Sequence, residues 1–287
     1  MFKAHALGLP SEHVPENTLA CCAGDLMDAL VLKLTITPAL IAAATLVGRR
    51  FGPIVSGWLV GLPLTSAPVV FFVALAHGKA FAAQVAFGIL LGTIAQSFCL
   101  LAYAHVAARE SRTNWFGSLV AGTVAFVCGA CLLQRIALPL LPTFAFVVAV
   151  VAITLFLMPR VHAPRARDER PSAWDLPARM LVATALVTGL SELSGAIGPR
   201  WTGLLSPFPV YGTILAVFAH RESGGAGAVE VMRGLETGMF SFAIFFTIVG
   251  LSIVHSGLLV AFASATAATL VVQAFALIWL TRNSVRA

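Results

Sequence analysis

The amino-acid sequence predicts an all-α integral membrane protein with about nine transmembrane helices, built as two inverted four-helix repeats joined by a linker helix. Three observations predict this fold class. The 287 residues are 59% hydrophobic and only 10% charged, whereas a soluble domain carries about a quarter charged residues. Apolar runs of bilayer-spanning length follow one another along the chain. A pattern of glycines and prolines recurs at a fixed spacing in the two halves.

The predicted spans follow from length and polarity, because about 20 mostly apolar residues cross the hydrocarbon layer. They lie at 29–47, 54–76, 80–105, 115–134, 138–158, 178–196, 201–219, 229–254 and 257–281. Segment 159–176 is a Pro- and Arg-rich loop, and 282–287 is a short C-terminal tail. Residues 1–27 hold no apolar stretch of signal-peptide length. We expect them to be a tail outside the membrane, or sequence upstream of a true start at Met27.

The orientation follows from the distribution of Lys and Arg among the loops, because cytoplasmic loops carry the excess. Eleven lie in alternate loops and the C-terminal tail: Arg49, Arg50, Arg109, Arg112, Arg160, Arg165, Arg167, Arg170, Arg221, Arg282 and Arg286. Four lie in the opposite set: Lys3, Lys79, Arg135 and Arg200. This asymmetry predicts an N-terminus outside, a cytoplasmic C-terminus and an odd number of helices. The expected location is the inner membrane.

The two halves of the chain share a motif, with FGPIVSGWLVGLP at 51–63 and IGPRWTGLLSPFP at 197–209. The offset of 146 residues places Pro63 over Pro209. At the same offset, the Gly88-xxx-Gly92 pair aligns with Gly234-xxx-Gly238 in the sequence. We expect these glycine pairs to form close packing faces that touch the proline-broken helices.

This register predicts membrane repeats at 28–137 and 177–281, with 138–158 as an unpaired linker helix. The second copy begins five crossings after the first, so it enters the membrane in the opposite direction. The distribution of Lys and Arg among the loops is independent of the repeat and predicts the same inversion.

Prolines interrupt the second and seventh spans at matching places. Each proline removes one backbone hydrogen bond, so we expect the carbonyls of Leu59, Leu64, Gly203 and Leu205 to be released. Broken helices in equivalent positions of two halves point to a binding site near the membrane midplane. The candidate substrate-binding residues are Pro63, Thr65, Ser66, Pro68, Gln96, Pro207, Pro209, Tyr211 and Thr213. The alternative is a pair of ordinary proline kinks whose hydroxyls bond back to their own helix.

Charged residues inside the spans are candidates for ion coupling. Glu236 and Arg233 lie in the eighth span, and Glu192 ends the sixth. Glu236 could carry a proton or a cation, or it could belong to an interfacial salt-bridge ladder with Glu230 and Arg233, in which Arg233 pairs with either carboxylate. The alternative for Glu192 is a helix-end residue in the outer interface. We expect His220 to be interfacial. The amides of Gln96 and Gln273 are expected first to join helices, with contact to a polar substrate as the alternative.

The architecture resembles inverted-repeat secondary transporters in general, which is a likeness of fold. The sequence therefore favours transport of a small polar or anionic solute by alternating access. The alternatives are a lipid-handling protein, a scaffold or a membrane enzyme. The chain shows no Walker motif and no clustered metal ligands, so we expect no cofactor, no metal and no catalytic residue. The expected partners are the solute or ion and membrane lipids, with no nucleic acid, and self-association stays open.

Overall fold

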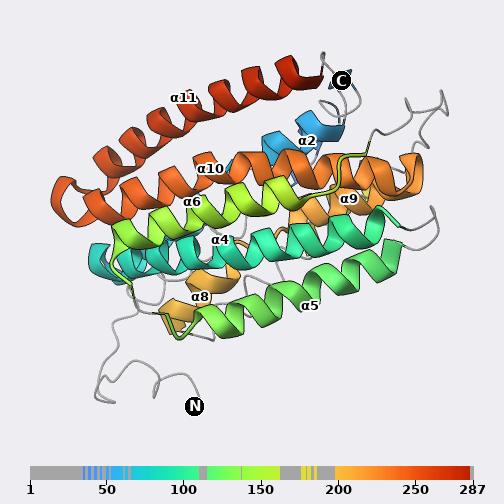
Figure 1. The fold of residues 1–287 in the computed structure, drawn as a ribbon. Coiled ribbons are helices and arrows are strands. Elements are labelled where there is room, and N and C mark those ends of the chain that lie inside the picture. Colours follow the sequence, from blue (N-terminus) through green and yellow to red (C-terminus); the bar gives the residue numbers. More distant parts are fainter. Residues whose placement is uncertain are drawn as a thin grey trace.

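The chain folds into a bundle of long helices in the computed structural model (Figure 1). The structure describes residues 35, 38–39, 42–43, 46, 50–51, 53–60, 62–63, 66–109, 115–136, 138–161, 176–178, 180–181, 184–185 and 198–284. The helices are α2 (Pro53–Val60), α3 (Ser66–His77), α4 (Lys79–Ala107), α5 (Trp115–Leu133), α6 (Leu140–Leu157), α8 (Gly198–Leu205), α9 (Val210–Ser223), α10 (Gly225–Ser256) and α11 (Leu258–Ser284). No strand occurs in these ranges, so the all-α prediction is confirmed for them.

Six helical segments within the described ranges are long and apolar enough to cross a membrane: Lys79–Ala107, Trp115–Leu133, Leu140–Leu157, Gly203–Ser223, Gly225–Ser256 and Leu258–Phe275. Each corresponds to one predicted span. The span predicted at 54–76 is divided between α2 and α3. Those predicted at 29–47 and 178–196 lie largely outside the described residues, so the count of nine stays a prediction.

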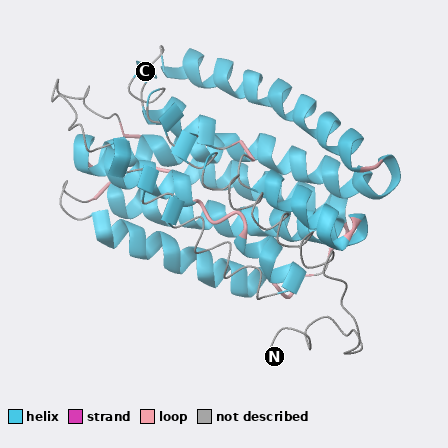
Figure 2. Ribbon diagram, turned by 180° about the vertical axis from the view of Figure 1, so that it is seen from behind, coloured by secondary structure: helices cyan, strands magenta, loops and turns pink. Residues whose placement is uncertain are grey.

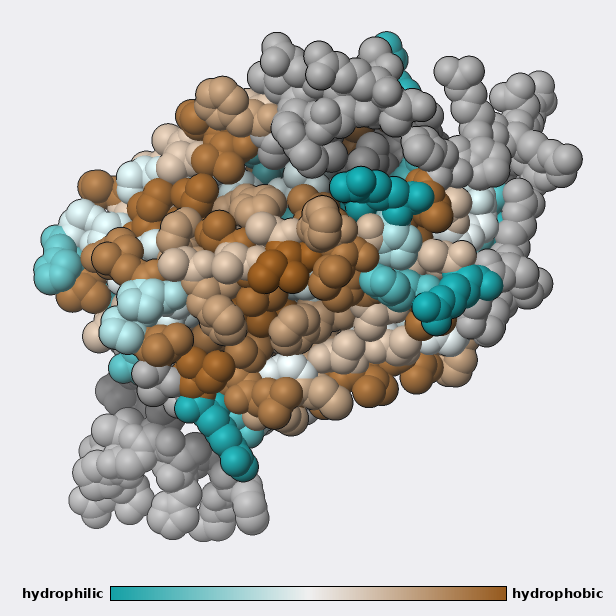
Figure 3. Space-filling model, in the orientation of Figure 1, coloured by the Kyte–Doolittle hydropathy of each residue, from teal (hydrophilic) through white to brown (hydrophobic). Residues whose placement is uncertain are grey.

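The surface explains why the helices are apolar on all sides. In Figure 3 hydrophobic side chains cover the middle of the visible face, and hydrophilic ones gather toward the two ends of the molecule. Exposed apolar side chains include Phe156, Leu259 and Phe275. Contiguous apolar surface of this extent requires an apolar surrounding. Together with the six spans, it identifies a multi-pass membrane protein.

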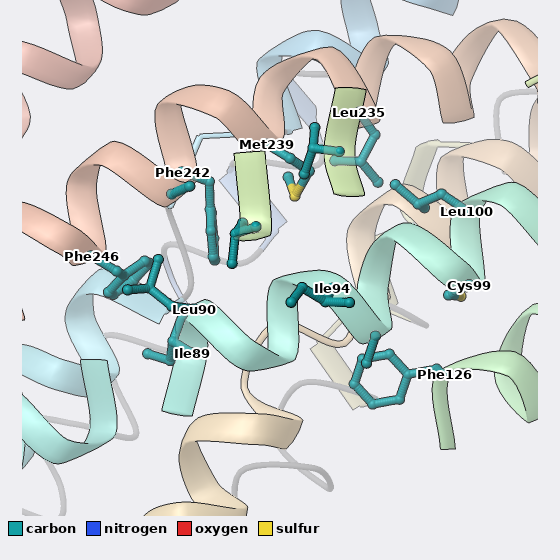
Figure 4. Close-up of a cluster of buried hydrophobic side chains, with 14 of the residues drawn as sticks. Ile89, Leu90, Ile94, Cys99, Leu100, Phe126, Leu235, Met239, Phe242 and Phe246 are labelled. Atoms are coloured by element: carbon teal, nitrogen blue, oxygen red, sulfur yellow. The ribbon is translucent and has the colours of Figure 1, made fainter. Parts of the chain in front are cut away.

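Helices α4 and α10 form the interior of the bundle, and α5, α6 and α11 lie at its periphery. Most of the spanning window of α4 is buried, whereas most residues in the windows of α5, α6 and α11 are not buried. Leu235, Met239 and Phe242 of α10 extend toward α4, which carries Leu90 and Ile94 (Figure 4). The packing of α4 against α10 determines where along the bundle axis the polar side chains of these two helices lie.

Helix α6 runs antiparallel to α10 in one continuous register. The Arg233 guanidinium reaches the carbonyl of Met158 at one end, and a Cβ at Gly250 would lie 3.4 Å from Leu140 at the other. Thr154 and Glu236 meet between these two points. Helix α6 also packs against α4, so it contacts both central helices.

Two helices are broken at the prolines, and the two breaks share two backbone hydrogen bonds. Leu62 N–H donates to Leu59 O at 3.3 Å, and Phe208 N–H donates to Leu205 O at 3.0 Å. Ala67 N–H donates to Pro63 O, and Thr213 N–H donates to Pro209 O. In both pairs, the bond in the second break lies 146 residues after its counterpart in the first break. Seen from behind, loops interrupt the helices in the middle of the molecule (Figure 2).

The same offset relates the junctions where α4 and α10 begin. Gly78 and Gly224 precede these helices with φ of 85° and 76°, values that L side chains rarely adopt. Gly78 N–H bonds Ala74 O, and Gly224 N–H bonds His220 O. Helix α10 thus begins at Gly225, four residues before the predicted 229. The sequence GGAG reads as a loop, but its small side chains allow α10 to start directly against α9.

The broken helices pack on the central pair in a crossed pattern. Helix α2 packs against α10, whereas α8 packs against α4. A Cβ at Gly203 would lie 2.8 Å from Gly88 Cα, and a Cβ at Gly92 would lie 2.5 Å from Leu204 O. The first predicted glycine pair therefore does form a packing face for a broken helix. Each broken helix thus packs on the long helix that follows the other break.

Candidate functional site

The two helix breaks touch each other. The Ser66 hydroxyl, at the start of α3, donates a hydrogen bond to the backbone carbonyl of Ser206 at 3.3 Å. Pro63 in the first break is buried, as are Pro207 and Pro209 in the second. Segments 140 residues apart in sequence thus meet at the point where both helices lose their regular hydrogen bonds.

The carbonyls expected to be released are partly recaptured. Leu59 O accepts the Leu62 N–H, and Leu205 O accepts the Phe208 N–H. The expectation that these two carbonyls are free was wrong, because the chain tightens into a turn of 3₁₀ type after each helix. The second break instead offers Ser206 O, which the Ser66 hydroxyl occupies.

Two hydroxyls at the breaks differ from those of several threonines in the long helices. Thr93, Thr123 and Thr247 each donate to the carbonyl four residues earlier in their own helix. Ser66 instead donates across to Ser206. The Thr213 Oγ1 atom is buried and has no hydrogen-bond partner among the described residues. These two hydroxyls therefore do not follow the alternative in which polar groups bond back to their own helix.

A second polar group faces this region from α4. Gln96 lies one turn after Gly92, whose position is in contact with Leu204 and Pro207 of the second break. The Gln96 side chain is buried, and its Oε1 has no hydrogen-bond partner within the described ranges. Unpaired buried polar atoms are uncommon in folded proteins and call for an explanation such as a ligand or water.

The other predicted binding residues have these positions. Tyr211 is buried at the start of α9, where it packs with Val210 and Ile214. Pro68 belongs to the first turn of α3, and its side chain is outside the described structure. Thr65 and the proposed coupling residue Glu192 both lie outside the described residues.

Glu236 occupies a separate polar cluster among α4, α6 and α10. It lies eleven residues after Gly225, the first residue of α10, or about 16 Å along the axis at 1.5 Å per residue. Its carboxylate is fully buried. The Thr154 hydroxyl of α6 donates to Oε1 at 2.5 Å. Ser97 of α4 lies beside the carboxylate, but neither Ser97 Oγ nor Glu236 Oε2 forms a hydrogen bond in the described structure.

Arg233 is one turn away from Glu236 but has other partners. Its Nη1 donates to the carbonyl oxygens of Met158 at 3.1 Å and Leu155 at 3.5 Å, at the end of α6. Among the described residues no ion pair joins Arg233 to Glu236. These contacts do not support a salt bridge between Arg233 and Glu236. Arg233 caps the last carbonyls of α6.

Gln273 confirms the expectation of an amide that joins helices. Its Oε1 accepts a hydrogen bond from the Ser241 hydroxyl of α10, and its Nε2 donates to Trp58 O at 2.9 Å. Trp58 belongs to α2, so one side chain of α11 connects α10 to the first broken helix. The partner carbonyl could not be read from the sequence, because it belongs to the backbone.

The site thus consists of two neighbouring polar regions: the crossing of the breaks and the Glu236 cluster. The first offers hydroxyl and amide groups without a formal charge, and the second offers a carboxylate. No group of three His, Cys, Asp or Glu side chains is placed to hold a metal ion in the part of the chain that is described. No protein-family model, curated protein or solved structure matches this chain.

Proposed function

We propose that this chain is a secondary transporter that moves a small polar or anionic solute by alternating access. The observation that carries the proposal is the contact between two helix breaks that share two backbone hydrogen bonds at an offset of 146 residues. The hydrogen bond from Ser66 to Ser206 joins the two breaks. Broken helices that meet at the interface of two repeats are the usual place for solute binding in such proteins.

The crossed packing supports an inverted repeat as the mechanical basis. Helices α2 and α8 occupy equivalent positions in the two halves, and each packs on the central helix of the other half. In the proposed cycle the two halves exchange shapes, so that the region around Ser66, Gln96 and Thr213 opens alternately to each side. The linker helix α6 contacts both central helices and provides the fixed frame.

Glu236 is the proposed coupling group. A buried carboxylate anion with a single hydroxyl donor is costly, and an intramembrane carboxylate is a functional candidate by default. We propose that it takes up a proton or a cation during the cycle, with Thr154 and Ser97 supplying further oxygen atoms. The cluster is distinct from the crossing of the breaks, so coupling would run through α10, which carries Glu236 and packs on α2.

The proposed location is the inner membrane, with the N-terminus outside and both the 159–176 loop and the C-terminus in the cytoplasm. The support is the distribution of Lys and Arg among the loops.

The test is solute uptake by the purified chain. Thermal-shift screening against amino acids, carboxylates, inorganic phosphate and Na⁺ selects ligands, because a native-state ligand raises the apparent stability. Selected solutes are then offered, radiolabelled, to proteoliposomes. We expect saturable uptake that falls at least tenfold in Ser66→Ala/Thr213→Val, with Thr123→Val as the control. Absence of uptake for every ligand that shifts the melting temperature would overturn the proposal.

A further inference from the structure

A cavity of about 390 Å³ lies between α6 and α10 on the periphery of the bundle. Two arginines and five other residues line it: Ala152, Leu155, Phe156, Arg160, Arg233, Thr237 and Phe240. Its volume is within the range of about 300–1,000 Å³ that is usual for ligand sites. It is separate from the crossing of the breaks described above.

The antiparallel register of α6 and α10 gives this cavity a polar end and an apolar end. Arg160 follows the last residue of α6 closely, and Arg233 contacts the Met158 carbonyl there. Ala152 and Phe240 lie at the other end, and Phe240 is seven residues, or about 10 Å, further along α10. The lining residues therefore change from two arginines to aliphatic and aromatic side chains along the helix axis, and carbon atoms form most of the cavity wall.

The charge at the polar end is uncompensated within the lining. Among the described residues that form the cavity, both charged groups are arginines and none is Asp or Glu. The bonds from Arg233 Nη1 to Leu155 and Met158 fix its guanidinium, and its Nε and Nη2 hydrogens take no part in those bonds. These remaining N–H donors are available to a ligand, and arginine binds phosphate groups through two parallel hydrogen bonds of this kind.

The apolar end faces outward. Phe156 is 75% exposed and Ala152 is exposed as well, on a helix whose spanning window is mostly unburied. In a membrane protein this surface borders the lipid chains. A ligand that satisfies both ends must carry a negative head group and a hydrocarbon chain.

We propose that this cavity is a binding site for an anionic phospholipid, with its phosphate at Arg160 and Arg233 and an acyl chain along Phe156 and Phe240. Basic pockets between membrane helices bind anionic head groups in this manner. The bound lipid would hold the end of α6 to the first turns of α10, one turn from Glu236. The proposal does not depend on transport.

The experiment uses the full chain in a neutral detergent, titrated with short-chain phosphatidylglycerol and followed by native mass spectrometry and thermal unfolding. We expect binding at least tenfold tighter than for phosphatidylcholine of the same chain length. Arg160→Gln should weaken binding at least fivefold, and Ala152→Trp should do so by filling the apolar end. Arg109→Gln removes the same charge from an exposed site outside the cavity and should leave binding unchanged.

Three results would overturn the proposal. Equal losses in Arg160→Gln and Arg109→Gln would show attraction to surface charge alone. Competition by inorganic phosphate at equal concentration would show a simple anion site. Unchanged binding in both Arg160→Gln and Ala152→Trp would place the lipid elsewhere. Arg233→Gln is not used here, because it also removes the cap on the end of α6 and would change stability as well as lipid binding.

Discussion

Ser66 donates its hydroxyl hydrogen to the backbone carbonyl of Ser206, and this bond has no counterpart in the other half. At the offset of 146 residues the equivalent of Ser66 is Gly212, which has no side chain to donate. A Cβ at Gly212 would lie 2.2 Å from Leu235 Cδ2, so a serine there would require the Leu235 side chain to move. The two breaks are thus joined by a side-chain hydrogen bond that only the first break can donate.

Ser66→Ala should loosen this contact. Removing one side-chain hydrogen bond costs about 0.5–1.5 kcal/mol, so we expect a small fall in the melting temperature of the purified protein. If the bond belongs to one conformation of an alternating cycle, solute affinity should change more than stability. Ser264→Ala is the matched control, because its hydroxyl is exposed and bonds back to Val260 O. Equal effects in the two variants would contradict a special role for Ser66.

Gly203→Ala should destabilise the fold strongly. The added Cβ would lie 2.8 Å from Gly88 Cα and from Val85 O, which are backbone atoms that cannot rotate away. Overpacking of this kind costs about 1–3 kcal/mol, measured as a lower midpoint of thermal unfolding in detergent. Gly250→Ala is the control, because its Cβ would meet only Leu140 side-chain atoms at 3.4 Å. A Gly203→Ala protein as stable as Gly250→Ala would contradict the close packing of α8 on α4.

The sequence predicted the long helices well, because their composition alone determines them. The span predicted at 115–134 is α5, Trp115–Leu133, and the one at 138–158 is α6, Leu140–Leu157. Apolar runs of this length have one stable form in a bilayer. The prolines likewise predicted where helices break, because a missing N–H is a local property.

The partners across the bundle could not be predicted in the same way. Thr154 contacts Glu236 from the linker helix, and Arg233 binds the carbonyls that end α6. Both contacts depend on the register of two helices about 80 residues apart, which no local pattern encodes. His220 shows the same limit. It was expected at the interface beside Arg221, but it is fully buried because α10 starts directly after α9.

Gly78→Ala and Gly224→Ala should destabilise the protein to a similar extent. Both glycines have positive φ, in a region of backbone conformation that is nearly restricted to glycine, and a strained residue there costs about 1–3 kcal/mol. They occupy equivalent junctions if the two halves are repeats. Thermal unfolding of the two single variants measures this. A large effect in one variant and none in the other would contradict the equivalence.

The 159–176 loop and the C-terminus should both lie in the cytoplasm. A reporter that is active only outside the cell, fused after Ala287, should be silent, and a reporter of cytoplasmic activity at the same place should be active. The physical reason is the excess of Lys and Arg on that side. Activity of the external reporter would overturn the orientation or the odd number of helices.

Glu236→Gln should abolish accumulation of the solute against a gradient, while exchange at equal concentrations persists. The amide cannot take up a proton or balance a cation as the carboxylate does, yet its oxygen can still accept the bond from Thr154. We therefore expect the melting temperature to stay level or rise, since a buried charge is removed. Uptake and exchange in proteoliposomes measure the two activities. Glu222→Gln, at an exposed position near the end of α9, is the control.

Combining Glu236→Gln with Arg233→Gln separates coupling from a salt bridge. A salt bridge predicts that Arg233→Gln restores the stability lost in Glu236→Gln. The observed contacts predict no rescue, because Arg233 binds Met158 and Leu155 carbonyls instead. Its loss should lower the melting temperature by a similar amount with either Glu or Gln at position 236, as expected for independent sites. Rescue in the double variant, or accumulation retained in Glu236→Gln, would remove Glu236 from the mechanism and leave Glu192 as the next candidate.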